Sequence, residues 1–540
     1  MTPKQQPFFV GLIAFALLTP AIPYLHNTQS PLDISLPPPE TLDTILEQSI
    51  CQRMSYRSYT ATSVTDQELS TILWAAYGYL DNGNRTIYHP TNAYSTVIYV
   101  IRSDATYIYV PENNSLHLFK TGNYLYLGQS TGAPIKLGMC WDKNVNSNEK
   151  DGMAEIGMTA QNVYFDANAL GLAALTTGSS VNDLYDLGIP SNQKPEIIMH
   201  VGHPQPLYNF DYDPLPASNL PAVVNNTMTL AEATNNRHLI TSWSDTPLTT
   251  LEESQTLWAS YGNSYLLDNN NHRHHRTLPS AVDIYPFFVY AANQTAVYLY
   301  NPAVHSVSTI LEGDHRSDIA TAIGSTNLSV ATAPWIILAF YDSTHNPQYM
   351  TWWYYESGAI MHNVLLEAGA LNLSANIGFN IADPAGLRTA LGIASHTSYT
   401  PEAFACVGTP TLPQNQPPLA PTLNGTASGN AKTQYNFTIS TVDPENDNVS
   451  YYLSWGDGTN TGWQSFVASG QPMTFAHSWA KKGTYTVSGK AKDVFGAESP
   501  VTTLKVIMPL TFNIPPGSFW YWLFQHFPNA FALLQKILNH

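Results

Sequence analysis

The amino-acid sequence repeats itself once over most of its length. Trp74-Ala75-Ala76-Tyr77-Gly78 returns as Trp258-Ala259-Ser260-Tyr261-Gly262, and other short motifs recur in the same order. The offset between the copies grows from 184 to 206 residues, which indicates that loops were inserted after a duplication. A repeat of this length is a domain and not the short unit of a solenoid. Two related domains are therefore predicted, residues 40–212 and residues 228–411. Further recurring pairs are Glu155-Ile156-Gly157 with Glu356-Ser357-Gly358, Asn162 with Asn363, and Leu187-Gly188-Ile189 with Leu391-Gly392-Ile393.

Composition bounds the class of partner. A chain of 540 residues with 44% apolar side chains can bury several cores. Its net charge is -17 and it has no run of Lys or Arg, which argues against nucleic acid as a partner. The three cysteines, Cys51, Cys140 and Cys406, are an odd number and cannot form a closed disulfide framework.

The two ends of the chain have their own patterns. Lys4 precedes the apolar stretch Phe8–Leu18, which resembles the core of a signal peptide and is shorter than a membrane-spanning helix. We expect residues 1–25 to direct export, as a cleaved signal peptide or an uncleaved anchor, and the alternative is a buried core helix. An extracellular or cell-surface location follows. Residues 518–540 are predicted to form an amphipathic helix that packs on the preceding domain, lies on a membrane or cell-envelope surface, or serves as a sorting tail.

The region after the second copy changes texture. Residues 412–421 form a Pro-rich linker, and residues 422–508 read as short alternating strands. Trp455-Gly456-Asp457-Gly458 and Gly483-Thr484-Tyr485-Thr486-Val487 resemble motifs of the PKD family of immunoglobulin-like modules. The resemblance implies an all-β sandwich that acts as a spacer or an adhesive domain.

Each copy mixes helices and strands in the order helix, helix, strands, helix, strand. Thr65, followed by Glu68, predicts a capped helix start, and Val97–Ile101 is a β-branched and aromatic strand. Ala160–Leu170 is an apolar helix buried on most of its faces. The expected fold class is therefore α+β, with two such domains.

The first copy opens with an Arg-x-Ser-x-Arg segment. Arg53-Met54-Ser55-Tyr56-Arg57 precedes the Trp74-Ala75-Ala76 helix, and two guanidinium groups with a hydroxyl bind a phosphate dianion well. This pattern resembles the opening of the nitroreductase-like FMN enzymes. The resemblance implies that Arg53, Ser55 and Arg57 bind FMN and that the protein is an FMN-dependent oxidoreductase.

The second copy contains a different segment of the same resemblance. Arg276-Thr277-Leu278-Pro279-Ser280-Ala281, followed by Tyr285-Pro286, resembles the SagB-type dehydrogenase branch. In these folds two subunits interlock, and the resemblance implies that Pro279, Ser280 and Ala281 reach the flavin bound by the other half. The Lys-Tyr pair of that branch is not evident before either Glu-x-Gly helix, so the substrate is left as a small molecule or a peptide.

The two copies have diverged differently. Copy one keeps Arg53, Ser55 and Arg57 but reads Pro90-Thr91-Asn92 where Pro-Ser-Ala is expected, whereas copy two reads Arg237-His238-Leu239-Ile240-Thr241 in place of the arginine segment. We therefore expect one complete composite site in a monomer that acts as an internal pseudo-dimer.

A third segment is assigned to the same site. Thr176-Thr177-Gly178 is expected in the loop after the Leu170-Gly171-Leu172 helix, where the resembled family passes backbone amides over the flavin ring. The alternative is that Gly178 only ends a helix.

No metal site is predicted. His272-Arg273-His274-His275-Arg276 contains several ligand types, but it lies in an Asn-rich stretch without Cys or carboxylate spacing, so we expect a solvated loop. The rival interpretation of the whole chain is a non-enzymatic cell-surface binding protein built on a diverged flavoprotein fold.

Overall fold

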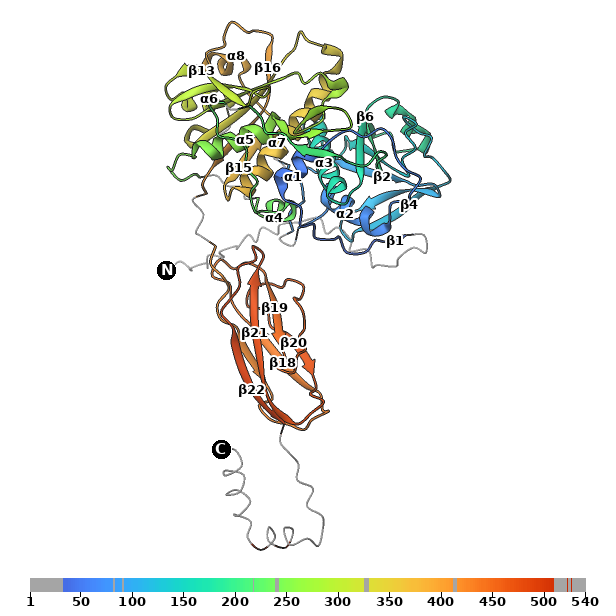
Figure 1. Ribbon diagram of the computed structural model, residues 1–540, viewed down its shortest axis with the longest axis vertical. Coiled ribbons are helices and arrows are strands. Elements are labelled where there is room, and N and C mark those ends of the chain that lie inside the picture. Colours follow the sequence, from blue (N-terminus) through green and yellow to red (C-terminus); the bar gives the residue numbers. More distant parts are fainter. Residues whose placement is uncertain are drawn as a thin grey trace, which may run out of the picture.

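The computed structural model describes most of the chain. It covers residues 33–508, except 81–82, 90–91, 217, 238–241, 325–329 and 411–414, together with Trp522 and His526. The predicted leader, residues 1–25, and nearly all of the predicted helix at 518–540 lie outside the described residues. Two mixed helix–sheet bodies lie side by side above a separate, elongated β body (Figure 1). Within the described part, no helix is both long and apolar enough to cross a membrane.

Copy one is an antiparallel sheet covered by helices. Its sheet has the order β1-β4-β3-β2-β5-β7-β6. The predicted cap of α2 is confirmed, because the Thr65 hydroxyl accepts from the Glu68 amide and the Glu68 carboxylate accepts from the Thr65 amide. The elements are β1 (Ile34–Ser35), α1 (Leu46–Gln52), α2 (Asp66–Tyr77), β2 (Thr96–Ile101), β3 (Ala105–Val110), β4 (Ser115–Thr121), β5 (Ile135–Asp142), α3 (Glu149–Ala169), β6 (Ala173–Thr177), η1 (Val181–Leu187) and β7 (Gln193–Gly202).

Copy two repeats the same layout. Its sheet order, β13-β12-β11-β14-β16-β15, matches that of copy one strand for strand, apart from the short edge strand β1. The elements are α4 (Leu230–Asn235), α5 (Thr250–Tyr261), η2 (Ala281–Asp283), β11 (Phe287–Ala292), β12 (Ala296–Asn301), β13 (Ser306–Glu312), α6 (Arg316–Ile323), η3 (Val330–Thr332), β14 (Trp335–Asp342), η4 (Pro347–Tyr349), α7 (Met350–Ala370), β15 (Ser374–Gly378), α8 (Pro384–Ala390) and β16 (Tyr399–Gly408). The predicted α+β class and the pseudo-dimer of two tandem domains are confirmed.

The halves meet along α3 and α7. These helices pass close enough that a Cβ on Gly157 would lie 2.0 Å from the Tyr355 carbonyl oxygen, and a Cβ on Gly358 would lie 2.0 Å from the Ala154 carbonyl oxygen. The glycine of each Glu-x-Gly motif is therefore required by contact between two helix backbones. One hydrophobic cluster runs through both copies around this crossing and includes Ile156 and Ile360.

Polar side chains fix the crossing with the same contacts twice. Asn162 and Asn363 each donate to a carbonyl of their own copy, that of Ala75 at 2.7 Å and that of Ala259 at 2.9 Å. Across the interface, Gln161 Nε2 donates to Asn363 Oδ1 at 3.0 Å. Its counterpart His362 places Nε2 2.6 Å from Asn162 Oδ1. Because buried amides are costly without partners, these contacts specify a single packing of the two helices.

The end of copy one joins a small sheet of copy two. β8 (Phe210–Tyr212) pairs with β9 (Asn263–Asp268), and β9 pairs with β10 (Arg273–Arg276). The segment that connects the copies is thus hydrogen-bonded to a strand of the second copy.

The C-terminal body is an all-β sandwich, as predicted. One sheet has the order β17-β18-β20 and the other β19-β21-β22, and Trp455, Trp479 and Phe437 lie in the core between them. The strands are β17 (Thr422–Gly425), β18 (Tyr435–Ser440), β19 (Val449–Ser454), β20 (Met473–His477), β21 (Gly483–Asp493) and β22 (Thr502–Met508).

The helix crossing yields a stability prediction. Gly157→Ala and Gly358→Ala should each lower the free energy of unfolding by about 1–3 kcal/mol, because the added methyl overpacks against a backbone that cannot move aside. Gly369→Ala is a graded comparison, since its Cβ would lie 2.8 Å from the Ala233 carbonyl oxygen, which is less close than 2.0 Å and should cost less. Chemical denaturation measures all three, and equal losses would show that the close helix contact does not set the cost.

Candidate functional site

A cavity of about 740 Å3 lies between the two copies. All nine residues that the sequence assigns to a cofactor line it, although they come from distant parts of the chain. Copy one contributes Arg53, Ser55, Arg57, Thr176, Thr177 and Gly178, and copy two contributes Pro279, Ser280 and Ala281. The geometry brings the predicted site together, and the binding roles of these residues stay predictions.

Arg53 is a buried cation with unused hydrogen-bonding capacity. Its side chain is 2% exposed, and its Nε and Nη2 both donate to the Arg276 carbonyl of the other copy at 3.2 Å. Its Nη1 has no protein partner. The guanidinium also lies over the Tyr164 ring at 5.4 Å. A buried donor without a partner is costly, so an acceptor that reached this nitrogen would stabilise the site.

Ser55 and Arg57 stand closer to the opening. The Ser55 hydroxyl shares a hydrogen bond of 3.2 Å with the Tyr164 hydroxyl. Arg57 is exposed, and its contact with the Ser55 carbonyl is long at 3.4 Å. Its guanidinium is therefore available to an anion in the cavity.

The Thr176–Gly178 segment differs from the expectation. Thr176 and Thr177 end strand β6 instead of lying in a loop, and Gly178 follows a strand, so its interpretation as a helix stop is wrong. The Trp352 indole packs directly on Gly178, where a Cβ would lie 1.6 Å from the ring. Glycine is required there by an aromatic side chain of the other copy. The Thr176 hydroxyl reaches across too, 3.2 Å from the Tyr355 hydroxyl.

The segment from copy two is held by a buried carboxyl group. The Ser280 hydroxyl donates to Glu356 Oε2 at 2.6 Å and accepts from the Tyr285 amide at 2.9 Å. Val282, with φ 47°, and Asp283, with φ 63°, then adopt left-handed backbone. That conformation is costly for a β-branched residue, and such strain is found mostly where the surroundings hold a segment in a fixed shape.

The histidine-rich segment is not the solvated loop that its composition suggests. Residues 273–276 form strand β10, and His275 is buried with Nε2 2.8 Å from Asp268 Oδ2. Burial lowers the pKa of His275 to about 4, with a further contribution from nearby Arg53, so the ring is neutral at pH 7. Arg273 and His275 both line the cavity. The sequence did not predict Arg273 and His275 as site residues, because the Asn-rich residues before β10 suggested a loop.

The structure also corrects the register between the copies. Thr86 and Thr277 donate their amides to the carbonyls of Gly78 and Gly262, both at 3.1 Å. Arg85 and Arg276 donate to the carbonyls of Tyr77 and Tyr261 at 2.8 and 3.0 Å.

This register places Tyr88 and His89 opposite Pro279 and Ser280. The assignment of Pro90-Thr91-Asn92 to that position is therefore wrong by two residues, and His89 is the counterpart of Ser280. Asn92, with φ 54°, correspondingly matches the left-handed Asp283.

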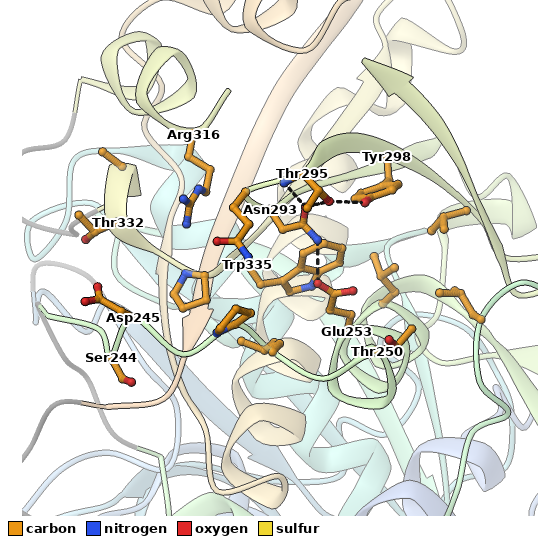
Figure 2. Close-up of a pocket in the computed structure, with 18 of the residues that line it drawn as sticks. Ser244, Asp245, Thr250, Glu253, Asn293, Thr295, Tyr298, Arg316, Thr332 and Trp335 are labelled. Atoms are coloured by element: carbon orange, nitrogen blue, oxygen red, sulfur yellow. Dashed lines mark hydrogen bonds between the residues drawn. The ribbon is translucent and has the colours of Figure 1, made fainter. Parts of the chain in front are cut away.

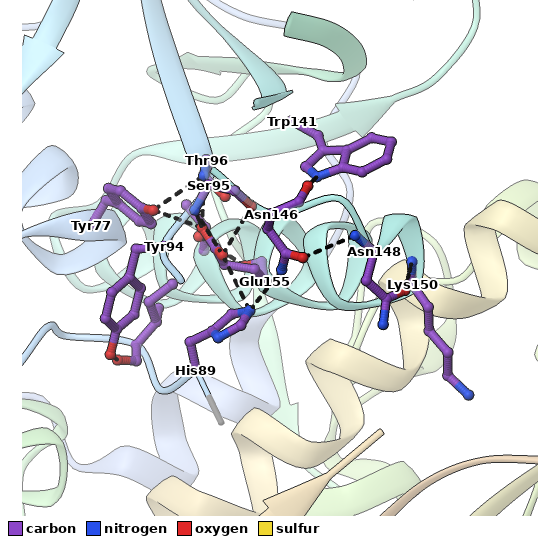
Figure 3. Close-up of polar contacts among 12 residues, drawn as sticks. Tyr77, His89, Tyr94, Ser95, Thr96, Trp141, Asn146, Asn148, Lys150 and Glu155 are labelled. Atoms are coloured by element: carbon purple, nitrogen blue, oxygen red, sulfur yellow. Dashed lines mark hydrogen bonds and ion pairs between the residues drawn. The ribbon is translucent and has the colours of Figure 1, made fainter. Parts of the chain in front are cut away.

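The glutamate of the Glu-x-Gly motif in copy one, Glu155, is enclosed by hydrogen-bond donors. Around Glu155, Figure 3 shows Tyr77, His89, Ser95 and Thr96. Its oxygens accept from the Tyr77 hydroxyl at 2.6 Å, from the Ser95 amide at 2.9 and 3.0 Å, and from the Thr96 amide at 2.7 Å. Two backbone amides and a phenol therefore hold this side chain in place.

Its counterpart in copy two lacks this support. Pro286 takes the place of Ser95 and has no N–H, and the Phe287 amide donates to the Tyr261 hydroxyl instead. Glu356 then accepts from the hydroxyls of Tyr261 and Ser280 alone. Burial raises the pKa of Glu356 to about 8, so this carboxyl group is largely protonated at neutral pH.

The second composite position, built around Arg237 of copy two, has different side chains. Arg237 donates to the Thr234 carbonyl at 2.9 Å and to the Arg85 carbonyl at 3.0 Å. The residue is half-buried, but its guanidinium is enclosed enough that burial lowers its pKa to about 10. Buried Phe379 follows β15 where Gly178 follows β6. Leu239 and Thr241, on which part of the predicted asymmetry rests, lie outside the described residues.

A second cavity, of about 720 Å3, is formed by copy two and the segment between the copies. Figure 2 shows Glu253, Asn293, Arg316 and Trp335 around it. Its guanidinium, Arg316, is already paired with Asp314 at 2.6 Å and donates to the Ala333 carbonyl. An anion would find no free cation among these side chains, whereas the cavity between the copies contains Arg53 and Arg57.

No metal centre can be assembled from the part of the chain that the structure describes. Among those residues, no group of three or more His, Cys, Asp or Glu side chains is arranged to hold an ion.

Comparison with known proteins identifies the family. The model of the nitroreductase family matches residues 50–203 and 208–409, which is more than half of the chain and includes both copies. The chain belongs to the nitroreductase family. This membership supports an oxidoreductase.

Three known proteins are similar to parts of the chain. A protein of Methanocaldococcus jannaschii that bears the name nitroreductase is 30% identical over 192 residues, covering 32% of this chain and 96% of that protein. A solved structure from Anabaena variabilis, also named as a nitroreductase, covers 70% of this chain and 98% of its own at 14% identity and a TM-score of 0.52, which shows the fold alone. The PKD domain of an M14-like peptidase from the Thermoplasmatales archaeon SCGC AB-540-F20 is 48% identical over 18% of this chain and 99% of its own, with a TM-score of 0.18.

Glu356 yields a pH-dependent stability prediction. Its folded-state pKa of about 8 lies above its ordinary value of 4.5, so its contribution is full below the ordinary value and is lost as the pH rises toward 8. Relative to Glu356→Gln, the wild type should lose free energy of unfolding by up to about 1.4 kcal/mol per pH unit between about pH 5 and pH 8. Denaturant titrations of both proteins across this range measure the difference, and parallel pH profiles would contradict it.

Proposed function

We propose that the protein is an FMN-dependent oxidoreductase with one composite flavin site between its two tandem domains. One observation carries the proposal: the buried guanidinium of Arg53, one nitrogen of which has no protein partner, belongs to the lining of a cavity built from both copies. Family membership supports flavin use, and the arginine segment of copy one resembles the phosphate-binding segment of nitroreductase-like enzymes.

The residues of the cavity fit the charge of FMN. Arg53, Arg57 and Arg273 contribute positive charge to a chain whose net charge is -17, and Arg273 is itself only 3.2 Å from Asp283. Arg53 and Arg57 would hold the phosphate, because a guanidinium binds a phosphate dianion through charge-assisted hydrogen bonds. The Ser55 hydroxyl adds a neutral partner.

Bound FMN would supply transfer of two electrons, and the protein supplies binding, orientation and electrostatics. Thr176, Tyr355 and Trp352 form a wall from both copies that would limit the access of water to the cavity. Ser280 is fixed by Glu356 and the Tyr285 amide, so the copy-two wall has a defined position before any ligand enters.

The proposal also covers the cellular location and the oligomeric state of the protein. We assign the protein to the exterior or the surface of the cell on the basis of its N-terminal sequence and its PKD-like sandwich, and we propose that it acts as a monomer. Its substrate is a small molecule or a peptide.

Arginine substitutions test the placement of the phosphate. Arg57→Ala and Arg53→Ala should each weaken FMN binding more than tenfold, since a charge-assisted contact contributes about 1.5–3 kcal/mol. Arg237→Ala is the matched control in the other copy and should change FMN affinity little. Fluorescence titration with FMN measures the three affinities. Equal losses in all three variants would place flavin in both composite positions.

Cofactor stoichiometry tests the asymmetry. One FMN per chain should be bound at saturation, because only one composite position combines the arginine segment with Ser280. Extraction and quantification of the flavin after reconstitution gives the ratio. Two flavins per chain would overturn the single-site proposal, and none would favour the non-enzymatic binding protein.

A further inference from the structure

Ser280 connects a buried carboxyl group to the cavity. Glu356 is fully buried and does not itself line the cavity, whereas Ser280 does. Their oxygens are 2.6 Å apart. The hydroxyl of Ser280 is therefore the link between Glu356 and any molecule in the cavity.

The protonation state of Glu356 determines in which direction the Ser280 hydroxyl donates its hydrogen bond. A hydroxyl has one donor and two acceptor positions, and the Tyr285 amide occupies one acceptor position at 2.9 Å. When Glu356 is ionised, Ser280 donates to it. When Glu356 is protonated, its own O–H can occupy the second acceptor position, and the Ser280 proton is then free to point into the cavity.

Burial favours the protonated form of Glu356, whereas the hydrogen bonds of Ser280 and Tyr261 and the charge of Arg276 favour ionisation. Tyr261 of α5 donates to it at 2.8 Å, and Tyr355 is its neighbour on α7. Arg276 of β10 is the nearby cation, but its guanidinium lies over the rings of Tyr261 and Tyr285 at 5.2 and 5.0 Å. With burial opposing ionisation and Arg276 favouring it, Glu356 exchanges its proton in an accessible pH range.

The same position in copy one has different partners. Glu155 accepts two backbone amides and the Tyr77 hydroxyl, and its serine-equivalent neighbour is His89, 3.7 Å away. Copy two has Pro286 where copy one has Ser95, so its glutamate lacks this amide donor. The glutamate with fewer donors is therefore the one that is hydrogen-bonded to the cavity residue Ser280.

We propose that Glu356 stores a proton and delivers it through the Ser280 hydroxyl to a two-electron acceptor in the cavity. The Ser280 O–H bond breaks as an O–H or N–H bond forms on the acceptor, and the Glu356 proton moves to Ser280 Oγ. Glu356 is left as a carboxylate and regains its proton from solvent by the reverse path. Glu356 is a positioning and proton-storing residue, and Ser280 is the group that touches the acceptor. This inference rests on the proposed oxidoreductase function.

The first test uses the protein without flavin. Infrared difference spectra across the pH range should show a protonated carboxyl band that is lost with a midpoint near pH 8 in the wild type and is absent in Glu356→Gln. Ser280→Ala should move the midpoint upward, because the Ser280 hydrogen bond stabilises the ionised form. Identical titrations of the wild type and Glu356→Gln would overturn the storage role, whether or not FMN binds.

The second test uses the FMN-reconstituted protein after chemical reduction. Two acceptors are compared: a benzoquinone, which needs a proton with its electrons, and ferricyanide, which takes electrons alone. Glu356→Gln and Ser280→Ala should each slow quinone reduction at least about tenfold more than they slow ferricyanide reduction, within the range of general acid catalysis. Ser280→Thr should restore the quinone rate. Ser179→Ala, which removes another hydroxyl of the cavity wall, is the control.

The outcomes separate the two proposals. Equal slowing of both acceptors, or an unchanged quinone rate in either variant, would overturn the proton path. Failure of the wild type to bind FMN would instead overturn the proposed function, and the infrared titration would still report on Glu356.

Discussion

Two glycines determine how closely the halves of this protein approach. Gly157 and Gly358 allow α3 and α7 to touch backbone to backbone, and a methyl group at either position would lie 2.0 Å from a carbonyl oxygen. The cross-contacts of Gln161 and His362 require this separation. So does the reach of Arg53 to the Arg276 carbonyl. The cavity exists because the helix crossing brings the arginine segment of one copy against the serine segment of the other.

On this common scaffold a few substitutions separate the two composite positions. Gly178 accepts the Trp352 ring on one side, whereas Phe379 occupies the matching position on the other. Pro286 has no amide where Ser95 provides one, so Glu155 and Glu356 have different hydrogen-bond donors, and burial raises the pKa of Glu356. None of these changes disturbs the sheet order, which is the same in both copies apart from β1. Differences in chemistry between the halves thus arise from single side chains and not from a change of fold.

The sequence predicted the fold class and the convergence of nine residues on one cavity, because the duplicated motifs fix which elements correspond. It failed where a local pattern had two explanations. The sequence alignment paired Pro90 with Pro279 because both are prolines. The register is instead set by hydrogen bonds of Arg85 and Thr86, which the sequence does not reveal. The polar residues around His275 suggested a loop, but this segment pairs with β9 and forms a strand. Glu356 repeated visibly in the sequence, yet its role depends on a proline seventy residues earlier in the chain.

Strand β8 gives the fusion of the two copies a structural meaning. It carries the chain from copy one into the β9–β10 sheet, whose last strand supplies Arg273 and His275 to the cavity. In a symmetric homodimer every mutation appears at both interfaces at once, so neither position can be altered alone. When the two halves are joined in one chain, each half is encoded by its own segment of the gene. A mutation can then change one half without changing the other. One position is free to be refined for chemistry while the other accumulates changes that serve only stability.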